Sequence, residues 1–198
     1  MTETTMGRRE RKKAATRQAL ADAALKLFLE RGYDQVGVKD VAEAADVSTT
    51  TLFKHFSGKE ALVFDMDADK EAALVAAVRD RPAGRTIPDA LRTHILATRF
   101  AHPDNPRLTE FLDLVENTPA LRDYSHRMWL RHQTALARAI AADIGVPADD
   151  PSCAALALFA LEAPSLTRNH PDPRHALNGA FDLLTAGWSA LHPTDAGT

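Results

Sequence analysis

The sequence is poor in cysteine, glycine and tyrosine. Its 198 residues include one cysteine, nine glycines and two tyrosines, against 36 alanines. A single cysteine excludes an internal disulfide framework and a four-cysteine zinc site. Because alanine is the best helix former and glycine is among the worst, the composition predicts an all-α protein.

Long apolar runs are also lacking. No run reaches the roughly 18 apolar residues that a membrane-spanning helix needs. The basic start MTETTMGRRERKK is not followed by an apolar stretch, which is unlike a signal peptide. We therefore expect a cytoplasmic protein with no membrane partner.

The small net charge of -3 hides an asymmetry between the two ends of the chain. Residues 1–60 carry 11 Lys and Arg against 9 Asp and Glu, whereas residues 61–198 carry 13 against 18. Six of the basic residues lie within 7–17, beside the single acidic residue Glu10. A basic end on an acidic body is typical of a chain that binds a polyanion there. A solvated N-terminal tail would have the same charge pattern, so charge alone leaves both interpretations open.

Helix caps and breakers divide the chain into about nine helical segments, and no stretch alternates with the period of a strand. Pro164 is expected to kink or end the eighth segment. The expected helices are 8–31, 38–45, 49–55, 58–79, 87–101, 105–116, 119–143, 152–168 and 173–191.

Segments 38–45 and 49–55 have the lengths and spacing of a helix-turn-helix. Ser48 is a natural N-cap for the second helix, and Leu52 can face the first long helix. Short polar and basic side chains then face outward, as the DNA major groove requires. A solvated helix hairpin in any helical bundle would show the same spacing. The expected outward residues are Thr49, Thr50, Thr51, Lys54 and His55.

Five short patterns follow one another between Arg17 and Leu62: A-x-x-L-F-x-x-x-G-Y, V-K-D-V-A, A-x-V-S, T-L-F-x-H-F and K-E-A-L. In this order and spacing they resemble the DNA-binding region of the tetracycline-repressor (TetR) family, over about a quarter of the chain. The resemblance implies a three-helix helix-turn-helix domain at 1–57 and a larger helical ligand-binding and dimerisation domain at 58–198. It also implies the function: a dimeric transcriptional regulator, a repressor that a small molecule releases from a near-palindromic double-stranded DNA operator.

The resemblance also assigns roles to individual residues. Thr49, Thr50 and Lys54 correspond to residues that contact base edges, and Lys39 corresponds to a frequent basic contact. The basic stretch Arg8–Lys13 would add a flexible contact to the DNA. The positions that correspond to phosphate contacts are Arg17, Thr51, His55 and Lys59.

Two residues in this region depart from the family pattern. Asp46 stands where the family often has glycine, and aspartate tolerates the turn conformation. Phe53 stands where tyrosine is usual in the DNA-binding surface. A phenyl ring cannot donate the phenolic hydrogen bond to a phosphate, so that contact should be missing.

The remainder of the chain shows weaker patterns. Segment 152–168 is apolar nearly all round, which indicates burial in a core or between subunits. In the family the last two long helices form the dimer interface, and an internal core of a monomer is the alternative. The candidate interface residues are Leu158, Leu161, Leu177, Phe181, Leu184 and Trp188.

A small-molecule pocket is the second expectation for this part of the chain. Arg99, Arg127 and Arg131 could pair with a carboxylate or phosphate, which favours an anionic or acyl-type effector. The resemblance to TetR relatives implies an acyl-type or lipophilic effector. The alternative for each candidate is ordinary core or solvated surface, which is the commoner place for such residues in a helical protein. The candidate lining residues are His94, Arg99, Phe100, Phe111, Leu114, Met128, Trp129 and Phe159.

Catalytic and metal-binding patterns are not found, and no cofactor is expected. His126 and His132 do not share a helix face cleanly, and His170 and His175 have no third ligand beside them. Cys153 begins an apolar run, as a buried inert thiol would. Two other classes remain open: a regulator of this fold without a small-molecule ligand, and a helical enzyme or adaptor that has kept the fold.

Overall fold

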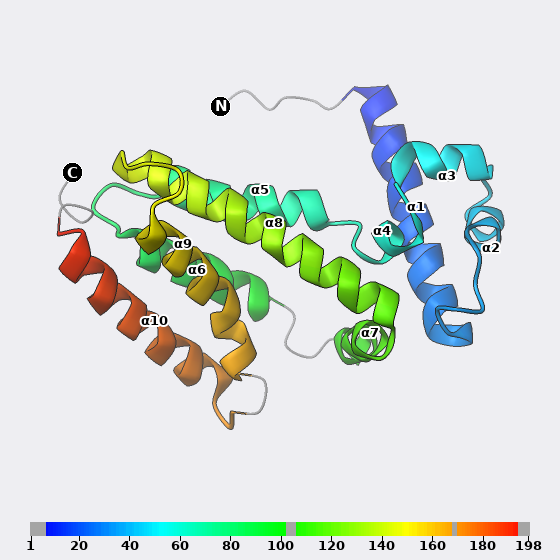
Figure 1. Cartoon of the computed structure of the whole chain (residues 1–198). Helices are drawn as coiled ribbons and strands as arrows, with labels where there is room; N and C mark the ends of the chain where they lie inside the picture. The colour runs from blue at the N-terminus through cyan, green and yellow to red at the C-terminus, as the bar shows by residue number, and fades with distance from the viewer. Residues whose placement is uncertain (1–6, 102–105, 168–169, 194–198) are drawn as a thin grey trace. The chain divides into compact units, whose positions relative to one another are not determined.

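A computed structural model describes residues 7–101, 106–167 and 170–193, and every described element is helical (Figure 1). The helices are α1 (Arg8–Arg31), α2 (Val38–Ala44), α3 (Thr49–His55), α4 (Lys59–Val63), α5 (Asp67–Arg79), α6 (Ile87–Arg99), α7 (Pro106–Asn117), α8 (Pro119–Ile144), α9 (Pro151–Glu162), the 3-10 turn η1 (Ala163–Thr167) and α10 (Pro173–Leu191).

Most of the predicted helices are confirmed to within two residues. The end of the long first helix shows why: Gly32 adopts a φ of 84°, and its N–H donates to the carbonyl of Phe28 at 3.0 Å. Glycine reaches this left-handed region without steric cost, so it ends the helix. Pro164 ends α9, and the chain continues as the 3-10 turn η1. The expected boundaries at 105 and 168 lie outside the described residues.

The prediction of one helix over 58–79 is wrong. The segment forms α4 and α5, separated by a turn at Phe64–Met66. Phe64 leaves the helical conformation, and its ring packs on Phe111 and Tyr124 with centroid distances of 6.0 and 5.3 Å. This packing involves a distant part of the chain, so the local sequence did not reveal the break.

The chain forms two compact units. The first contains residues 7–67 and 106–126, and in it α2, α3 and α4 pack around α1 (Figure 1). Fully buried side chains such as Leu20, Phe28 and Leu52 form its core. Each contributes about 1.5–3 kcal/mol of hydrophobic free energy.

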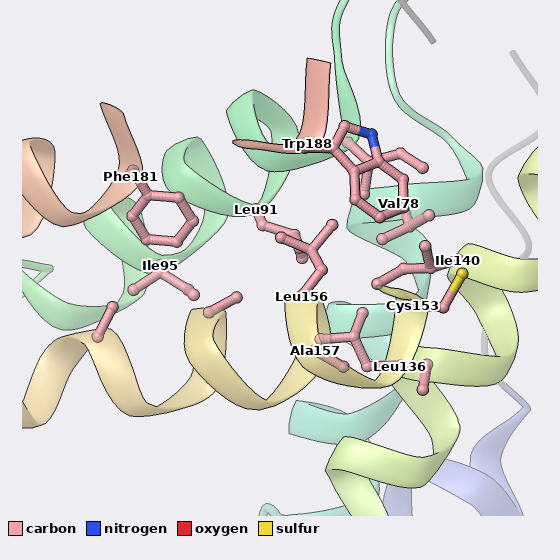
Figure 2. Packing of buried hydrophobic residues seen from close by; sticks show 14 of the residues in the cluster. Val78, Leu91, Ile95, Leu136, Ile140, Cys153, Leu156, Ala157, Phe181 and Trp188 are labelled. Atoms are coloured by element: carbon pink, nitrogen blue, oxygen red, sulfur yellow. The ribbon is translucent and has the colours of Figure 1, made fainter. Parts of the chain in front are cut away.

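The second unit contains residues 68–101, 127–167 and 170–193. Its core joins α6, α9 and α10 with parts of α5 and α8. Figure 2 shows Phe181 and Trp188 of α10 pointing into a layer that includes Leu91 and Leu156.

Candidate nucleic-acid interface

The α2–α3 pair is built by local hydrogen bonds that the sequence encodes within a few residues. Asp40 Oδ2 accepts the N–H of Gly37 at 2.7 Å, which closes the start of α2. Ser48 Oγ accepts the N–H of Thr51 at 3.1 Å and so caps α3. Between the helices Asp46 adopts a φ of 53°, the left-handed conformation that aspartate tolerates. The predicted turn and cap are thereby confirmed.

One face of α3 is fixed by burial. Leu52 is fully buried against the first unit's core, and Phe56 follows it into the same core. Thr50, Phe53 and Lys54 are consequently exposed, and Thr49 is half-buried. None of the seven residues of α3 is acidic. We call Thr49, Thr50, Phe53 and Lys54 the reading surface.

The α2 side of this region is hollowed. Lys39 of α2 is exposed and lines a shallow hollow together with Thr49. Glu43 and Asp46 lie on the same hollow. The hollow therefore presents both signs of charge, whereas the reading surface carries only Lys54.

The basic stretch Arg8–Lys13 is helical and not a flexible arm, because α1 begins at Arg8. All its side chains are exposed. The pKa of His55 is lowered by burial first, and then by the positive charges of Lys13 and Arg17. The stretch thus places positive charge beside the end of α3.

The expected phosphate contacts Thr51 and His55 are half-buried on α3. Thr51 Oγ1 lies 2.9 Å from Ser48 Oγ, so the hydroxyl also takes part in the cap. The Nδ1 atom of His55 is buried and accepts or donates no hydrogen bond within the described residues.

Arg17 holds two carbonyl groups of its own chain. Nη1 donates to the carbonyl of His55 at 2.7 Å and Nη2 to that of Asp65 at 2.6 Å. The guanidinium carbon also lies 4.3 Å from the centre of the Phe56 ring. No sequence signal pointed to these partners, because two of them are 38 and 48 residues away.

Lys59 is likewise engaged within the first unit. Its Nζ donates to the carbonyl of Tyr33 and lies 3.8 and 5.4 Å from the ring centres of Tyr33 and Phe28. Burial lowers the pKa of Lys59, while Asp34 and Glu60 act in the opposite direction.

The candidate pocket residues do not gather in one unit. Phe111 and Leu114 pack against the core of the first unit. The other six belong to the second unit, where Met128 is buried but Trp129 and Phe159 are exposed. The guanidinium of Arg174 lies 4.4 Å from the centre of the Phe100 ring. Burial lowers the pKa of His94.

The candidate dimer residues divide into two groups. Leu177, Phe181 and Trp188 are buried in the core of the second unit, so their side chains pack within the protomer. Leu161 and Leu184 are partly buried against that core, and Leu158 is exposed. Three further apolar residues, which the sequence did not single out, are exposed: Leu166, Leu183 and Leu191.

The histidines considered as metal ligands do not assemble. Within 7–101, 106–167 and 170–193, no three His, Cys, Asp or Glu side chains gather as a metal site would require. The pKa of the buried Cys153 is raised to about 11, mainly by burial and then by the negative charge of Asp150. Its thiol is therefore protonated at neutral pH. In the same part of the chain no helix is long and apolar enough to cross a membrane.

Comparison of the sequence with known proteins finds a matching family model and two similar regulators. Residues 20–66 match the model of the bacterial regulatory proteins of the tetR family. The HTH-type transcriptional regulator TcmR of Streptomyces glaucescens is 35% identical over 151 residues, which cover 73% of this chain and 67% of TcmR. The putative mycofactocin biosynthesis transcriptional regulator MftR of Mycobacterium tuberculosis is 27% identical over 196 residues, 92% of this chain and 96% of MftR.

Solved structures share the fold at lower identity. The structure of the SmeT–triclosan complex covers 87% of this chain and 91% of its own at 19% identity, with a TM-score of 0.59. The TetR family repressor AlkX of Dietzia, implicated in biodegradation of n-alkanes, covers 87% and 97% at 17% identity, with a TM-score of 0.58.

Proposed function

The chain belongs to the tetR family of bacterial regulatory proteins, and from this premise we propose that it is a dimeric repressor that a small molecule releases from a near-palindromic operator. It is a DNA-binding transcriptional regulator and not an enzyme. We propose that residues 1–57 form the DNA-binding domain and that residues 58–198 bind the effector and the second subunit.

The reading surface is the observation that carries the proposal. Lys54 can donate to the O6 and N7 acceptors of guanine, and the hydroxyls of Thr49 and Thr50 can pair with either kind of base-edge group. On one face of α3 Thr50 and Lys54 are exposed and Thr49 is half-buried, while Leu52 anchors the opposite face. A short capped helix with this composition suits the major groove.

The helical basic stretch at the start of α1 supports the electrostatic part of the interface. Its cations are all exposed, and the last of them, Lys13, lies close enough to the end of α3 to help lower the pKa of His55. Cations that neutralise DNA phosphates release counterions, so affinity should fall steeply with salt.

A second copy of the chain is the proposed partner of the α10 surface. Gly179, Leu183, Gly187 and Leu191 recur every four residues on one side of α10, and both leucines are exposed. A Cβ added to either glycine would meet nothing within 4 Å in this chain. Mid-helix glycine costs about 1 kcal/mol relative to alanine. Close approach of a partner helix would explain both the glycines and the exposed leucines.

The effector is proposed to bind the second unit and to be lipophilic or acyl-type. AlkX is implicated in n-alkane degradation and SmeT is seen with triclosan, which supports an apolar small molecule. The effector must bind one geometry of the dimer more tightly than the other, because only differential affinity shifts the equilibrium. The conformational change that the effector favours would reach α3 through the turn between α5 and α4, because these two helices are not continuous.

The experiment that tests this function is selection of genomic DNA fragments by the purified protein near physiological salt, followed by footprinting. We expect a protected near-palindrome upstream of a gene. Lys54→Ala should reduce discrimination against mismatched sites about 5- to 150-fold, which corresponds to the roughly 1–3 kcal/mol of a good base contact. The control is Lys26→Ala, an exposed lysine of α1 outside the reading surface, which should leave discrimination unchanged. Absence of any enriched fragment, together with no binding at low salt, would contradict the helix-turn-helix assignment.

A further inference from the structure

Arg17 joins two segments that are far apart in sequence. Its side chain leaves α1 half-buried, and its two terminal nitrogens donate to the carbonyls of His55 and Asp65 at 2.7 and 2.6 Å. Phe56 lies under the guanidinium at 4.3 Å. The planar guanidinium has the rigid fork of donors needed to hold two acceptors at once.

The two acceptors have distinct places in the fold. His55 is the last residue of α3, where helix carbonyls have no partner inside the helix and attract a cation. Asp65 lies in the turn between α4 and α5, at the break that separates these helices. Arg17 therefore holds the end of α3 at a fixed distance from this turn.

The turn is also the route by which the chain enters α5. Most of α5, from residue 68 onward, belongs to the second unit. A change in the position of Asp65 would therefore pull on Arg17 and, through it, on the carbonyl end of α3.

From this geometry we propose that Arg17 is a positioning residue that sets the orientation of α3 relative to the α4–α5 turn, and that it does not act by gripping a phosphate. The inference rests on the proposed function, since orientation matters only if α3 reads DNA. Both terminal nitrogens of Arg17 are already committed to carbonyls, whereas Lys13, one turn earlier on α1, is exposed.

Arg17→Lys separates the two roles. Lysine keeps the positive charge and can still attract a phosphate, but a single ammonium lacks the planar fork that spans both carbonyls. The experiment measures affinity for the selected operator and for a scrambled duplex over a series of salt concentrations, with wild type, Arg17→Lys, Arg17→Ala and Lys13→Ala.

The positioning role predicts that both Arg17 variants lower the ratio of operator to scrambled affinity at least tenfold. It also predicts that the salt slope on scrambled DNA is unchanged. Lys13→Ala is the matched control. It should weaken binding to both duplexes alike. It should also reduce the steepness of the plot of log affinity against log salt concentration by about 0.9, as the loss of one phosphate contact does.

Three results would overturn the inference. Arg17→Lys could bind both duplexes like wild type, or Arg17→Ala could behave like Lys13→Ala; either would make Arg17 a phosphate contact. A lower melting temperature with an unchanged affinity ratio would leave Arg17 a purely stabilising role. Arg17→Lys decides the matter alone if Arg17→Ala fails to fold. A wild-type protein that binds both duplexes equally would instead contradict the proposed function itself.

Discussion

The ammonium of Lys59 lies 3.8 Å from the centre of the Tyr33 ring and donates a hydrogen bond to the carbonyl of the same residue. This pair joins the start of α4 to the segment that follows α1. A cation over an aromatic ring is attracted by the negative face of the ring, and the attraction grows with burial. The family resemblance assigns Lys59 to a phosphate, whereas this geometry indicates a role in stability.

Lys59→Met should therefore lower the free energy of unfolding by about 2–4 kcal/mol, through the loss of one charged hydrogen bond and of the cation–π contacts with Tyr33 and Phe28. Chemical denaturation followed by circular dichroism would measure it. Lys54→Met, an exposed lysine on α3, is the control and should change the stability by less than about 0.5 kcal/mol. Wild-type stability in Lys59→Met, combined with uniformly weaker DNA binding, would restore the phosphate role.

Phe53→Tyr should strengthen binding to operator and scrambled DNA alike, by roughly 3- to 10-fold. Phe53 is 55% exposed, so a phenolic hydroxyl can be added without disturbing the core. The hydroxyl would supply a hydrogen bond to a phosphate, worth about 1 kcal/mol net. Fluorescence anisotropy with both duplexes would measure the change, with Phe53→Leu as the control that adds no donor. A gain restricted to the operator would mean that Phe53 faces a base and not the DNA backbone.

Leu183→Asp should convert the dimer to a monomer at micromolar concentration. The side chain is 76% exposed, so the folded protomer should tolerate the substitution, while a charge buried between subunits would be costly. Sedimentation velocity would report the mass, and operator affinity should fall at least tenfold with it. Ser189→Asp adds the same charge to α10 away from the Gly179–Leu191 line and should remain dimeric. An unchanged mass for Leu183→Asp would place the interface elsewhere.

Stability should fall as the pH drops below the ordinary histidine pKa of 6.5. Burial lowers the pKa of His55 and of His94 in the folded protein, so between the lowered values and 6.5 the unfolded chain binds more protons. The free energy of unfolding then rises with pH through this window and is fully recovered above it.

Urea midpoints between pH 5 and 8 would show this slope. The double variant His55→Gln, His94→Gln removes both groups and should be less sensitive to pH across the window. If the double variant keeps the full slope, other groups are responsible.

Local signals in the sequence were sufficient for the helix-turn-helix. The cap at Ser48, the turn at Asp46 and the buried face of Leu52 depend on hydrogen bonds and side-chain periodicity within a few residues. The ordered patterns from Arg17 to Leu62 added the family.

Long-range packing decided which of the apolar helix residues are buried. Leu177 and Leu183 are both apolar residues of α10, yet one is fully buried and the other is 76% exposed. Helical spacing shows that an apolar face exists, but which face meets the core depends on where α6 and α9 lie.

By itself the sequence determined most of the helices, their caps and the family, because these depend on interactions between near neighbours. Only the tertiary structure decided that Arg17 and Lys59 bind carbonyl groups of their own chain and that residue 64 breaks a helix. Those outcomes depend on partners 26 to 60 residues away, from Lys59 and Tyr33 to Phe64 and Tyr124, which come together only when the core packs.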